Sequence, residues 1–249
     1  MKVSIITANY NNEHTLQMCL ESVSQQTYAD IEHIVIDGAS TDGSMKLIES
    51  HSNAADIKYF SSKDNGIYDA LNKGIAKATG DIIGILHSDD VFAHSEVIEN
   101  IVSQFESKDC DGVYGDLHYF KGNSPLNIIR NWVSKPFKNH LLKQGWMPPH
   151  PTLYLKSKVY HTNGFYKSNY KIAADYDFMI NLFSQSQLKF SYVPEVFVKM
   201  RTGGISNSSL KNIITKSMED YKILKENNFK NPLYTLTLKN LSKVKQFVK

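Results

Sequence analysis

Two adjacent carboxylates, Asp89 and Asp90, follow a short apolar run in the segment HSDD at residues 87–90. Adjacent carboxylates that follow a buried strand repel each other unless water or a cation neutralises their charge. A hard divalent cation prefers oxygen ligands and is often held by one or two carboxylates together with substrate phosphates. The pair therefore indicates a metal site that also receives a phosphate-bearing substrate. The alternative is a helix N-terminus, where Asp is a favoured cap.

A second polar segment, DGASTDGS at residues 37–44, could contact a nucleotide. A carboxylate at its start, on Asp37, could accept a hydrogen bond from the imide of a nucleobase, in a pattern that suits uracil. The alternating acidic positions of a calcium EF-hand loop are missing. The alternative is an Asx-type turn that leads into a helix.

A third group of acids lies in AADYDFMINL at residues 173–182. Asp175 and Asp177 precede apolar residues at helical spacing, so the two acids stand at the beginning of a helix with an apolar face. Their alternative role is stabilisation of the helix N-terminus.

The elements that must position these residues alternate between short apolar runs and helical patterns. This alternation is typical of βαβ units and a mainly parallel sheet. Strands are expected at residues 3–8, 33–36, 57–60, 81–86 and 112–120, and helices after Asn11 or Asn12, after residue 44, at Ile67 and near Val97. In parallel α/β sheets, ligands bind beyond the carboxyl ends of the strands. The polar segments 7–10, 37–42 and 87–90 each follow a strand, so we expect them to meet at one edge of the sheet.

The composition is ordinary for a globular protein, with 249 residues of which 21% are charged and 41% hydrophobic. The net charge of +3 is too small to indicate nucleic-acid binding. Two cysteines, Cys19 and Cys110, fit neither a disulfide framework nor a metal site, which indicates a reducing compartment. The N-terminal apolar run is too short for a signal peptide, and no stretch approaches the roughly 18 apolar residues of a membrane span. We therefore expect a cytoplasmic protein.

The pattern changes after residue 120. Residues 121–165 hold five of the seven prolines and both tryptophans, which favours irregular segments that line a cleft. The chain then ends in a helical segment in which residues 211–249 carry nine lysines and three acids, a net charge of +6. Such a basic helix could lie on an anionic membrane surface. The alternative is a solvated helix face.

Seven motifs together resemble family 2 of the inverting glycosyltransferases. They run in the family's order from residue 3 to about residue 206: VSIITANYNN, VIDGASTDGS, SKDNGIYDALNKGIAKATGDIIGILHSDD, PPHPTLYLKSKVY, NGFY, AADYDFMINL and RTGGIS. Each motif alone is weak, whereas the ordered set is specific, and it most resembles the branch that builds bacterial surface polysaccharides. The resemblance implies a GT-A-like nucleotide-sugar-binding α/β fold, with a mainly parallel central sheet flanked by helices and a helical, basic C-terminal tail.

The resemblance also implies roles for individual residues in binding the donor. The residues expected to contact the nucleotide sugar are Thr7, Ala8, Tyr10, Asp37, Asp64, Tyr68, Asn72 and Asp89. Asp89 and Asp90 correspond to the acidic metal motif, and the implied cofactor is Mn²⁺ or Mg²⁺. Many relatives have Asp or Asn where His87 stands here, which leaves open which of the two carboxylates contacts the metal.

Catalysis is assigned by the resemblance to Asp175, the expected general base. Inverting transfer needs a carboxylate that takes the proton of the acceptor hydroxyl while that oxygen attacks the anomeric carbon. Asp177, two residues farther along the helix, points elsewhere and is a weaker candidate for the base. Other residues expected near the acceptor or the diphosphate are His150, Asp177, Gly203 and Gly204.

The predicted activity is metal-assisted transfer of a sugar from a UDP-sugar to a hydroxyl of a saccharide or a lipid-linked acceptor, in the synthesis of cell-surface polysaccharide. We expect a catalytic domain at residues 1–205, with a donor half at 1–120 and an acceptor half at 121–205, followed by a helical, basic tail at 206–249. The tail is expected to dock on the domain or to make peripheral contacts, of which the inner face of the membrane is one. The alternatives are a non-catalytic protein that binds a sugar nucleotide and a sugar nucleotidyltransferase. The latter should carry a Gly-rich, basic phosphate loop after the first strand, and ITANYNN has neither feature.

Overall fold

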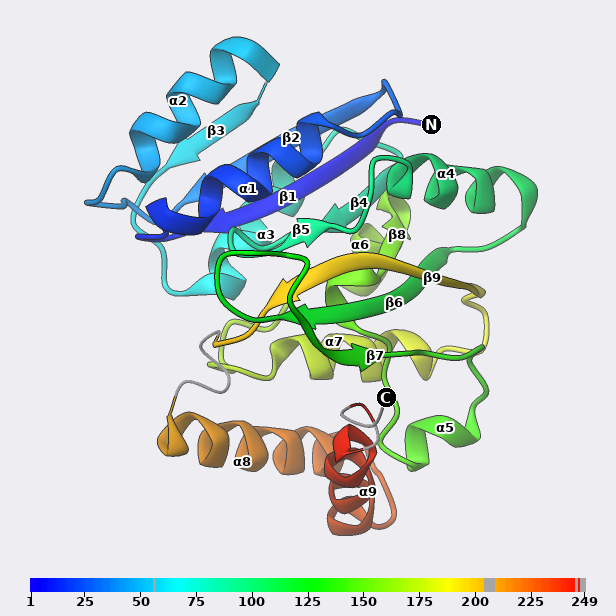
Figure 1. The fold of residues 1–249 in the computed structure, drawn as a ribbon. Coiled ribbons are helices and arrows are strands. Elements are labelled where there is room, and N and C mark those ends of the chain that lie inside the picture. The colour runs from blue at the N-terminus through cyan, green and yellow to red at the C-terminus, as the bar shows by residue number, and fades with distance from the viewer. Residues whose placement is uncertain (56, 204–208, 245, 247–249) are drawn as a thin grey trace.

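The computed structural model of the protein describes residues 1–55, 57–203, 209–244 and 246. Within these ranges the chain forms an α/β structure in which one twisted sheet carries helices on both faces (Figure 1). The predicted α/β class is thus confirmed. The sheet includes strands from both the predicted donor half and the predicted acceptor half.

The first part of the sheet is parallel and has the order β3-β2-β1-β4. Its strands are β1 (Val3–Asn9), β2 (Ile31–Asp37), β3 (Lys58–Ser61) and β4 (Ile82–Ile85), and the helices that join or follow them are α1 (Glu13–Ser24), α2 (Ser44–Ala55), α3 (Ile67–Lys77) and α4 (Val97–Ser107). Every residue of β1 is buried, as expected for a parallel strand that is covered on both faces. The register pairs Asn9 with Asp37, so β1 and β2 end side by side.

The second part of the sheet continues in the order β4-β8-β6-β9-β5, and β7 pairs with β6. These strands are β5 (Val91–Phe92), β6 (Gly112–Phe120), β7 (Ile128–Trp132), β8 (Tyr154–Lys156) and β9 (Phe190–Arg201). β6 and β9 are parallel, whereas β8 runs antiparallel to both β4 and β6. The short α5 (His140–Lys143), the 3₁₀ turn at His150–Thr152 and α6 (Ser157–Asn163) complete this part.

The segment 121–165 is more regular than its prolines suggested, because it contains β7, β8, α5 and α6. β8 is only three residues long, and the strand pairing that defines it lies far away in the sequence, at Ile82–Ile83 and at Gly112–Val113. No local pattern carries that information. The strand β9 was also not predicted.

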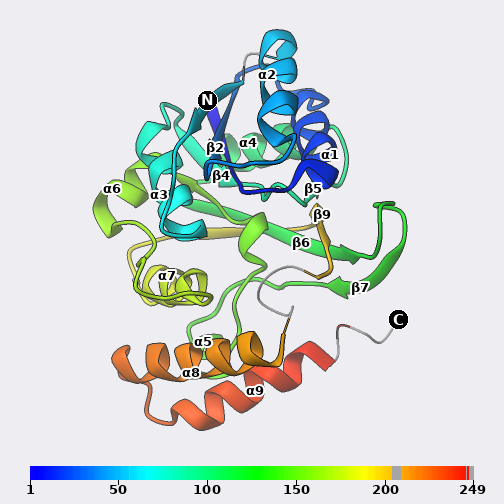
Figure 2. The same ribbon diagram turned by 90° about the vertical axis from the view of Figure 1, so that its left-hand side faces the viewer.

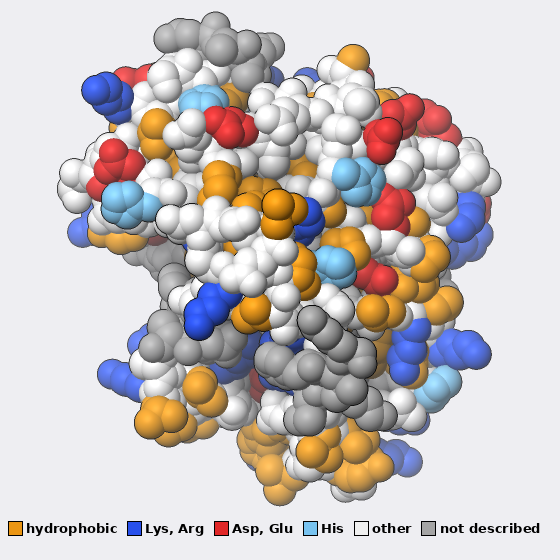
Figure 3. All heavy atoms as spheres, in the orientation of Figure 1, with side chains coloured by type: hydrophobic (Ala, Val, Ile, Leu, Met, Phe, Trp, Pro, Cys, Tyr) orange, Lys and Arg blue, Asp and Glu red, His pale blue; other side chains and the backbone are white. Residues whose placement is uncertain are grey.

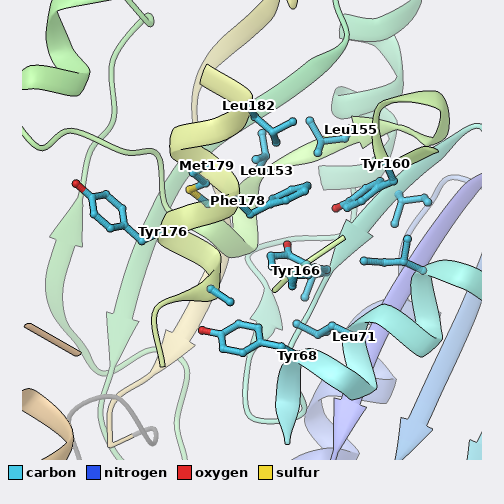
Figure 4. Close-up of a cluster of buried hydrophobic side chains, with 14 of the residues drawn as sticks. Tyr68, Leu71, Leu153, Leu155, Tyr160, Tyr166, Tyr176, Phe178, Met179 and Leu182 are labelled. Carbon is cyan, nitrogen blue, oxygen red and sulfur yellow. The ribbon is translucent and has the colours of Figure 1, made fainter. Parts of the chain in front are cut away.

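A buried aromatic and aliphatic cluster joins α3 to α7 (Ala174–Phe183) and β8 (Figure 4). In this cluster the rings of Tyr68 and Tyr166 stack with centroids 5.8 Å apart, and Tyr166 also packs against Phe178 at 4.7 Å. Aromatic pairs at such separations add to the free energy gained by burying their surface. The cluster fixes α7 relative to α3, which matters because both helices carry residues of the site.

The chain continues through α8 (Leu210–Glu226) and α9 (Pro232–Val244), so the helical tail is confirmed for the described residues. Both helices lie beneath α7 in two perpendicular views (Figures 1 and 2). A buried ion pair of 2.8 Å between Lys239 and Asp220 joins the two helices, and the Lys239 ammonium lies 3.1 Å from the centre of the Tyr176 ring of α7. None of the helices in the described part of the chain could cross a lipid bilayer, given its length and polarity.

Candidate active site

A large cavity of about 1680 Å³ lies between the carboxyl ends of the parallel strands and the tail helices. Its wall includes the end of β1, the residues around the start of α3, the segment after β4, the first turn of α7, and parts of β7, α8 and α9. Segments from the first 90 residues and from the last 40 therefore face the same space. Of the three polar segments expected to meet at one sheet edge, 7–10 and 87–90 line this cavity. The segment 37–42 hydrogen-bonds to Asn9 and Asn11 but does not line the cavity.

Asp37 ends β2 but is fully buried and does not line the cavity. Its carboxylate accepts hydrogen bonds from Asn9 Nδ2 at 2.9 Å, from the Ser40 backbone N–H at 2.9 Å and from Ser61 Oγ at 2.8 Å. Burial alone would raise the pKa of Asp37, and these hydrogen bonds outweigh burial and lower it. The Ser40 contact is the Asx-type turn of the alternative interpretation. Asp37 therefore holds the loops behind the cavity wall.

Thr7 is also placed behind the cavity wall, because its hydroxyl is buried and lies 2.9 Å from His33 Nε2. The neighbouring Ala8 and Tyr10 do line the cavity, and the Tyr10 side chain is 65% exposed. Of these predicted nucleotide contacts, Tyr10 thus has the free surface that a nucleotide would need.

Asp64 lines the cavity beside Tyr10 and is held by the backbone N–H of Gly66, which donates to its Oδ1 at 2.9 Å. A side chain at position 38 would collide with this carboxylate, since a Cβ built on Gly38 would lie 2.6 Å from Asp64 Oδ2. Glycine at position 38 therefore lets the Asp64 carboxylate approach the loop that follows β2. This contact brings two of the predicted donor motifs together.

Tyr68 and Asn72 lie one turn apart on α3 and differ in their surroundings. The Tyr68 hydroxyl donates to the Ile172 carbonyl oxygen at 2.6 Å and lies 3.3 Å from Asp175 Oδ1, so it links the donor side of the cavity to the predicted base. Asn72 instead binds both backbone groups of Tyr166, at 2.7 and 3.0 Å, and does not line the cavity. Its position indicates that it anchors the segment before α7.

The two carboxylates of HSDD occupy different environments. Asp89 lines the cavity, whereas Asp90 is fully buried and its Oδ1 accepts a hydrogen bond from the Arg201 backbone N–H at 3.0 Å. Burial, and then repulsion by Asp89, raise the pKa of Asp90 well above its ordinary value. Asn12 stands at the N-cap of α1 as expected, but its side chain donates to Ser88 Oγ at 2.9 Å and so fixes the loop that carries Asp89.

Asp175 faces the cavity from the first turn of α7. Its Oδ2 lies 3.6 Å from His150 Nδ1, and His150 Nε2 lies 2.9 Å from His87 Nε2. Burial lowers the pKa of His150 to about 4, so this imidazole is neutral at neutral pH. A neutral His150 that presents Nδ1–H to Asp175 would accept a hydrogen bond from His87 at Nε2. The two histidines thus join the loop of Asp89 to the predicted base.

The electrostatic surroundings of Asp175 favour its ionised form. Burial alone would raise the pKa of this carboxyl, but the neighbouring His150 and Lys216 outweigh burial and hold the pKa below its ordinary value. An ionised carboxylate in contact with the cavity can accept a proton, which is the first requirement of a general base.

Asp177 points away from the cavity, as expected for a residue two positions farther along the helix. Its carboxylate is buried, lies 3.0 Å from Lys167 Nζ and accepts a hydrogen bond from Asn181 Nδ2 at 3.2 Å. Gly203 lines the cavity with a backbone φ of 105°, in the region that favours glycine. Gly204 lies outside the described residues.

The tail contributes site residues that the sequence did not single out. Glu219 of α8 accepts hydrogen bonds from the backbone N–H groups of Lys171, Ile172 and Ala173 at 2.8 to 2.9 Å, and so holds the turn that leads into α7. Asp175 is thereby left free to face the cavity. Lys216, Lys239 and Lys243 also line the cavity, although a basic tail was expected to face solvent or a membrane. The spacing of Lys239 and Lys243, one helical turn apart, was a signal that the two share a face.

The donor atoms around Asp89 fit a divalent metal ion. Among the residues that the structure describes, no group of three or more His, Cys, Asp or Glu side chains could hold a metal by itself. Asp89 nevertheless presents oxygen ligands to the cavity, and the buried Asp90 beside it has an Oδ2 without a hydrogen-bond partner among the described residues. Mg²⁺ is commonly bound by one or two carboxylates whose coordination shell is completed by substrate phosphates and water. The residues present therefore suit a cation that arrives with a phosphate-bearing substrate.

Solved structures of other proteins resemble this fold, and two of them contain a nucleotide sugar. One is TarS of S. aureus in complex with UDP-GlcNAc, with a TM-score of 0.74, 16% identity and coverage of 91% of this chain and 65% of that chain. The other is a mannosyltransferase of Pyrobaculum calidifontis in complex with GDP-Man and Mn²⁺, with a TM-score of 0.66, 16% identity and coverage of 95% of this chain and 68% of that chain. These likenesses confirm the expected GT-A-like fold.

Sequence relatives are glycosyltransferases. A PGL/p-HBAD biosynthesis glycosyltransferase of Mycobacterium bovis is 28% identical over 209 residues, which cover 82% of this chain and 79% of the relative. An uncharacterized glycosyltransferase of Mycobacterium tuberculosis is 33% identical over 180 residues, which cover 72% and 67%. The model of glycosyl transferase family 2 matches residues 4–171. The chain therefore belongs to glycosyl transferase family 2 and is a transferase enzyme.

Proposed function

We propose that the protein transfers a sugar from a nucleoside diphosphate donor to an acceptor hydroxyl, with inversion at the anomeric carbon and with the help of a divalent metal. The observation that carries this proposal is one cavity that Asp64, Asp89 and Asp175 all line. The nucleotide sugars in the two similar structures, UDP-GlcNAc and GDP-Man, support a donor of this class, and UDP is the nucleotide that we propose.

In the proposed reaction, Asp175 takes the proton of the acceptor hydroxyl while the hydroxyl oxygen attacks the anomeric carbon. The bond between that carbon and the diphosphate oxygen breaks on the opposite face, and the nucleoside diphosphate leaves with the bonding electron pair. Tyr68 and His150 hold the carboxylate of Asp175 from two sides, at 3.3 and 3.6 Å. When bound at Asp89, the metal ion would stabilise the charge that develops on the diphosphate.

Placement of the residues within the cavity suggests how the donor would be held. Tyr10, Asp64 and Asp89 would contact the nucleotide and its diphosphate, and Gly203 would offer backbone near the leaving group. Behind the cavity wall, these loops would be fixed by Asp37, Thr7 and Asn72. Asp90 would fix the HSDD segment in the same way, and Asp177 would fix α7. The division into a donor half at 1–120, an acceptor half at 121–205 and a tail is part of the proposal.

A screen of nucleotide sugars tests the proposed activity. We expect UDP-sugars to raise the melting temperature of the protein in the presence of Mn²⁺ and to do so much less after chelation with EDTA. A ligand at a hundred times its Kd stabilises the folded state by about 2.7 kcal/mol, which is readily measured as a thermal shift. Slow hydrolysis of the stabilising donor, with release of UDP, would separate an enzyme from a non-catalytic binder. Equal stabilisation with and without metal would contradict the proposed metal site.

We further propose that the tail brings the enzyme to an anionic membrane surface on the cytoplasmic side, where it acts in the synthesis of cell-surface polysaccharide. α8 exposes Leu210, Ile214 and Met218 on one face, with exposed fractions of 80%, 60% and 67%, and α9 exposes Leu233 and Leu241. Figure 3 shows hydrophobic side chains along the edge of the molecule where these helices lie, with lysine and arginine side chains nearby. An apolar face flanked by cations is the pattern of helices that bind anionic bilayers.

Vesicle sedimentation tests this membrane contact. We expect binding to phosphatidylglycerol vesicles that weakens as salt is raised, and little binding to phosphatidylcholine vesicles, because surface charge attraction is screened by salt. The double variant Ile214→Gln/Met218→Gln should lose most of the binding. Leu126→Gln, which removes an 83% exposed apolar side chain outside the tail, is the control and should bind like the original protein. Equal binding of both variants would refute the assigned surface.

A further inference from the structure

Three lysines of the tail helices face the cavity beside Asp175. Lys216 comes from α8, and Lys239 and Lys243 come from α9. These three residues are referred to below as the lysine cluster. Asp175 and His150 line the same cavity, and the positive charge of Lys216 lowers the pKa of each.

Only part of the positive charge of the lysine cluster is balanced within the protein. Lys239 is buried, forms its ion pair with Asp220 at 2.8 Å and lies over the Tyr176 ring. Lys243 donates a hydrogen bond to the neutral Asn240 at 3.2 Å, and Lys216 forms no ion pair with a described residue. Among the described residues, Asp220 is thus the carboxylate that forms an ion pair with the lysine cluster.

Such an arrangement costs free energy in the absence of a ligand. Like charges one helical turn apart repel each other, and partial burial removes the water that would screen them. Burial, followed by repulsion from Lys216 and Lys239, lowers the pKa of Lys243 to about 8. An anion bound between Lys216 and Lys243 would relieve both the repulsion and the loss of hydration.

The position of the lysine cluster points to the acceptor rather than to the donor. The residues around Asp89 come from β1, α3 and the segment after β4, whereas the cluster comes from the tail helices at the other end of the molecule (Figures 1 and 2). In both views α7, whose first turn carries Asp175, lies between the sheet and the two tail helices. A diphosphate at Asp89 and an anion at the lysine cluster would therefore be separate groups that contact different elements of the cavity wall.

We propose that the lysine cluster is a subsite for a phosphate or diphosphate group that the acceptor carries next to the hydroxyl deprotonated by Asp175. This inference rests on the proposed function of Asp175. Phosphate groups offer several charged oxygens to more than one ammonium group, which suits lysines that converge from two helices. The same cavity is lined by the apolar side chains of Leu238 and Leu241, which belong to α9 like Lys239 and Lys243, so an acceptor could place apolar surface beside the anion.

Binding of inorganic pyrophosphate in the presence of EDTA tests the subsite separately from the metal-dependent donor site. We expect isothermal titration calorimetry to show binding to the original protein, and the double variant Lys216→Gln/Lys243→Gln to weaken it at least about tenfold, because charged hydrogen bonds are lost. The matched control is Lys211→Gln/Lys225→Gln, which removes the same net charge from exposed positions of α8 outside the cavity. The control should bind within about twofold of the original protein.

Further measurements distinguish a subsite from a structural role. Without ligand, Lys216→Gln/Lys243→Gln should melt at the same or a higher temperature, because like-charge repulsion is removed. Its affinity for UDP in the presence of Mn²⁺ should stay unchanged. If the original protein does not bind UDP in the presence of Mn²⁺, the proposed donor site is wrong. The pyrophosphate titrations then test the subsite by themselves. Equal pyrophosphate affinity in both double variants would overturn the subsite.

A second ligand distinguishes the two sources of such an anion. Farnesyl diphosphate carries an apolar chain beside the diphosphate. If it binds more tightly than pyrophosphate, and if Lys216→Gln/Lys243→Gln abolishes this binding, the subsite belongs to a lipid-linked acceptor. Binding equal to that of pyrophosphate, also lost in this variant, would assign it to a water-soluble phosphorylated saccharide. Farnesyl diphosphate affinity that is the same in both double variants would contradict the proposal.

Discussion

Replacing Asp175 with Asn is expected to lower the turnover of sugar transfer by about a thousandfold, within the range of general acid–base contributions, and to leave donor affinity nearly unchanged. Asn has the same shape, so the contacts of Asp175 with Tyr68 and His150 can persist. The amide cannot take the proton of the acceptor hydroxyl. Initial rates with saturating donor and acceptor, together with the Kd for UDP in the presence of Mn²⁺, measure the two effects separately.

The matched control for this prediction is Asp177→Asn. It changes a second carboxylate on the same helix turn, but that carboxylate is paired with Lys167 and lies outside the cavity. Turnover of the control should stay within a few fold of the original enzyme, while its melting temperature falls, since the buried side chain at position 177 loses its charged contact with the half-exposed Lys167. Transfer that survives in Asp175→Asn, or that is lost in Asp177→Asn instead, would show that Asp175 is not the base.

Replacing Asp89 with Asn is expected to weaken Mn²⁺-dependent binding of the donor by about a hundredfold, the upper end of losses seen around metal ligands. Asp89 presents its carboxylate to the cavity, where it would share the cation with the diphosphate. An amide keeps the size and removes the charge. Titration of the nucleotide sugar at several Mn²⁺ concentrations should therefore show an affinity that hardly responds to the metal.

The variant Asp90→Asn, at the neighbouring position, is expected to differ from Asp89→Asn in how donor binding responds to the metal. Asp90 is buried, its pKa is raised well above the ordinary value, and its Oδ1 accepts from the Arg201 backbone, which an amide oxygen can also do. This variant should keep the metal response of donor binding. A loss of that response in Asp90→Asn with none in Asp89→Asn would reverse the assignment of the metal-binding carboxylate.

The parallel half of the sheet could be predicted because its information is local. Each of β1, β2 and β4 is a short apolar run that ends at polar residues, and the helices between them show apolar residues at helical spacing. The topology of parallel sheets then brings the ends of β1 and β2 together. In contrast, β8 is defined by partners more than 40 residues away in the sequence, and the three prolines just before it, in PPHP at residues 148–151, hide it.

The site could be predicted to the level of its motifs, but not to the level of which side chain faces the cavity. Asp37 and Asp89 each follow a strand, yet Asp37 turns back onto its own loop and Asp89 does not. That difference depends on Asn9, Ser40 and Ser61, which supply hydrogen bonds to Asp37 from three separate segments. The inward direction of Lys216 and Lys243 depends on how α8 and α9 pack against α7, and no local pattern encodes it.

The hydrogen bonds from the turn before α7 to Glu219 have a consequence for biosynthesis of the enzyme. A nascent chain that has left the ribosome only as far as residue 205 holds every strand of the sheet and the cavity residues beside Asp89. Its backbone N–H groups at Lys171, Ile172 and Ala173 must wait for α8 to emerge and supply their acceptor. The strands can thus pair before α8 is made, and the helix that carries the proposed base receives this support from a segment that follows the whole sheet in the sequence.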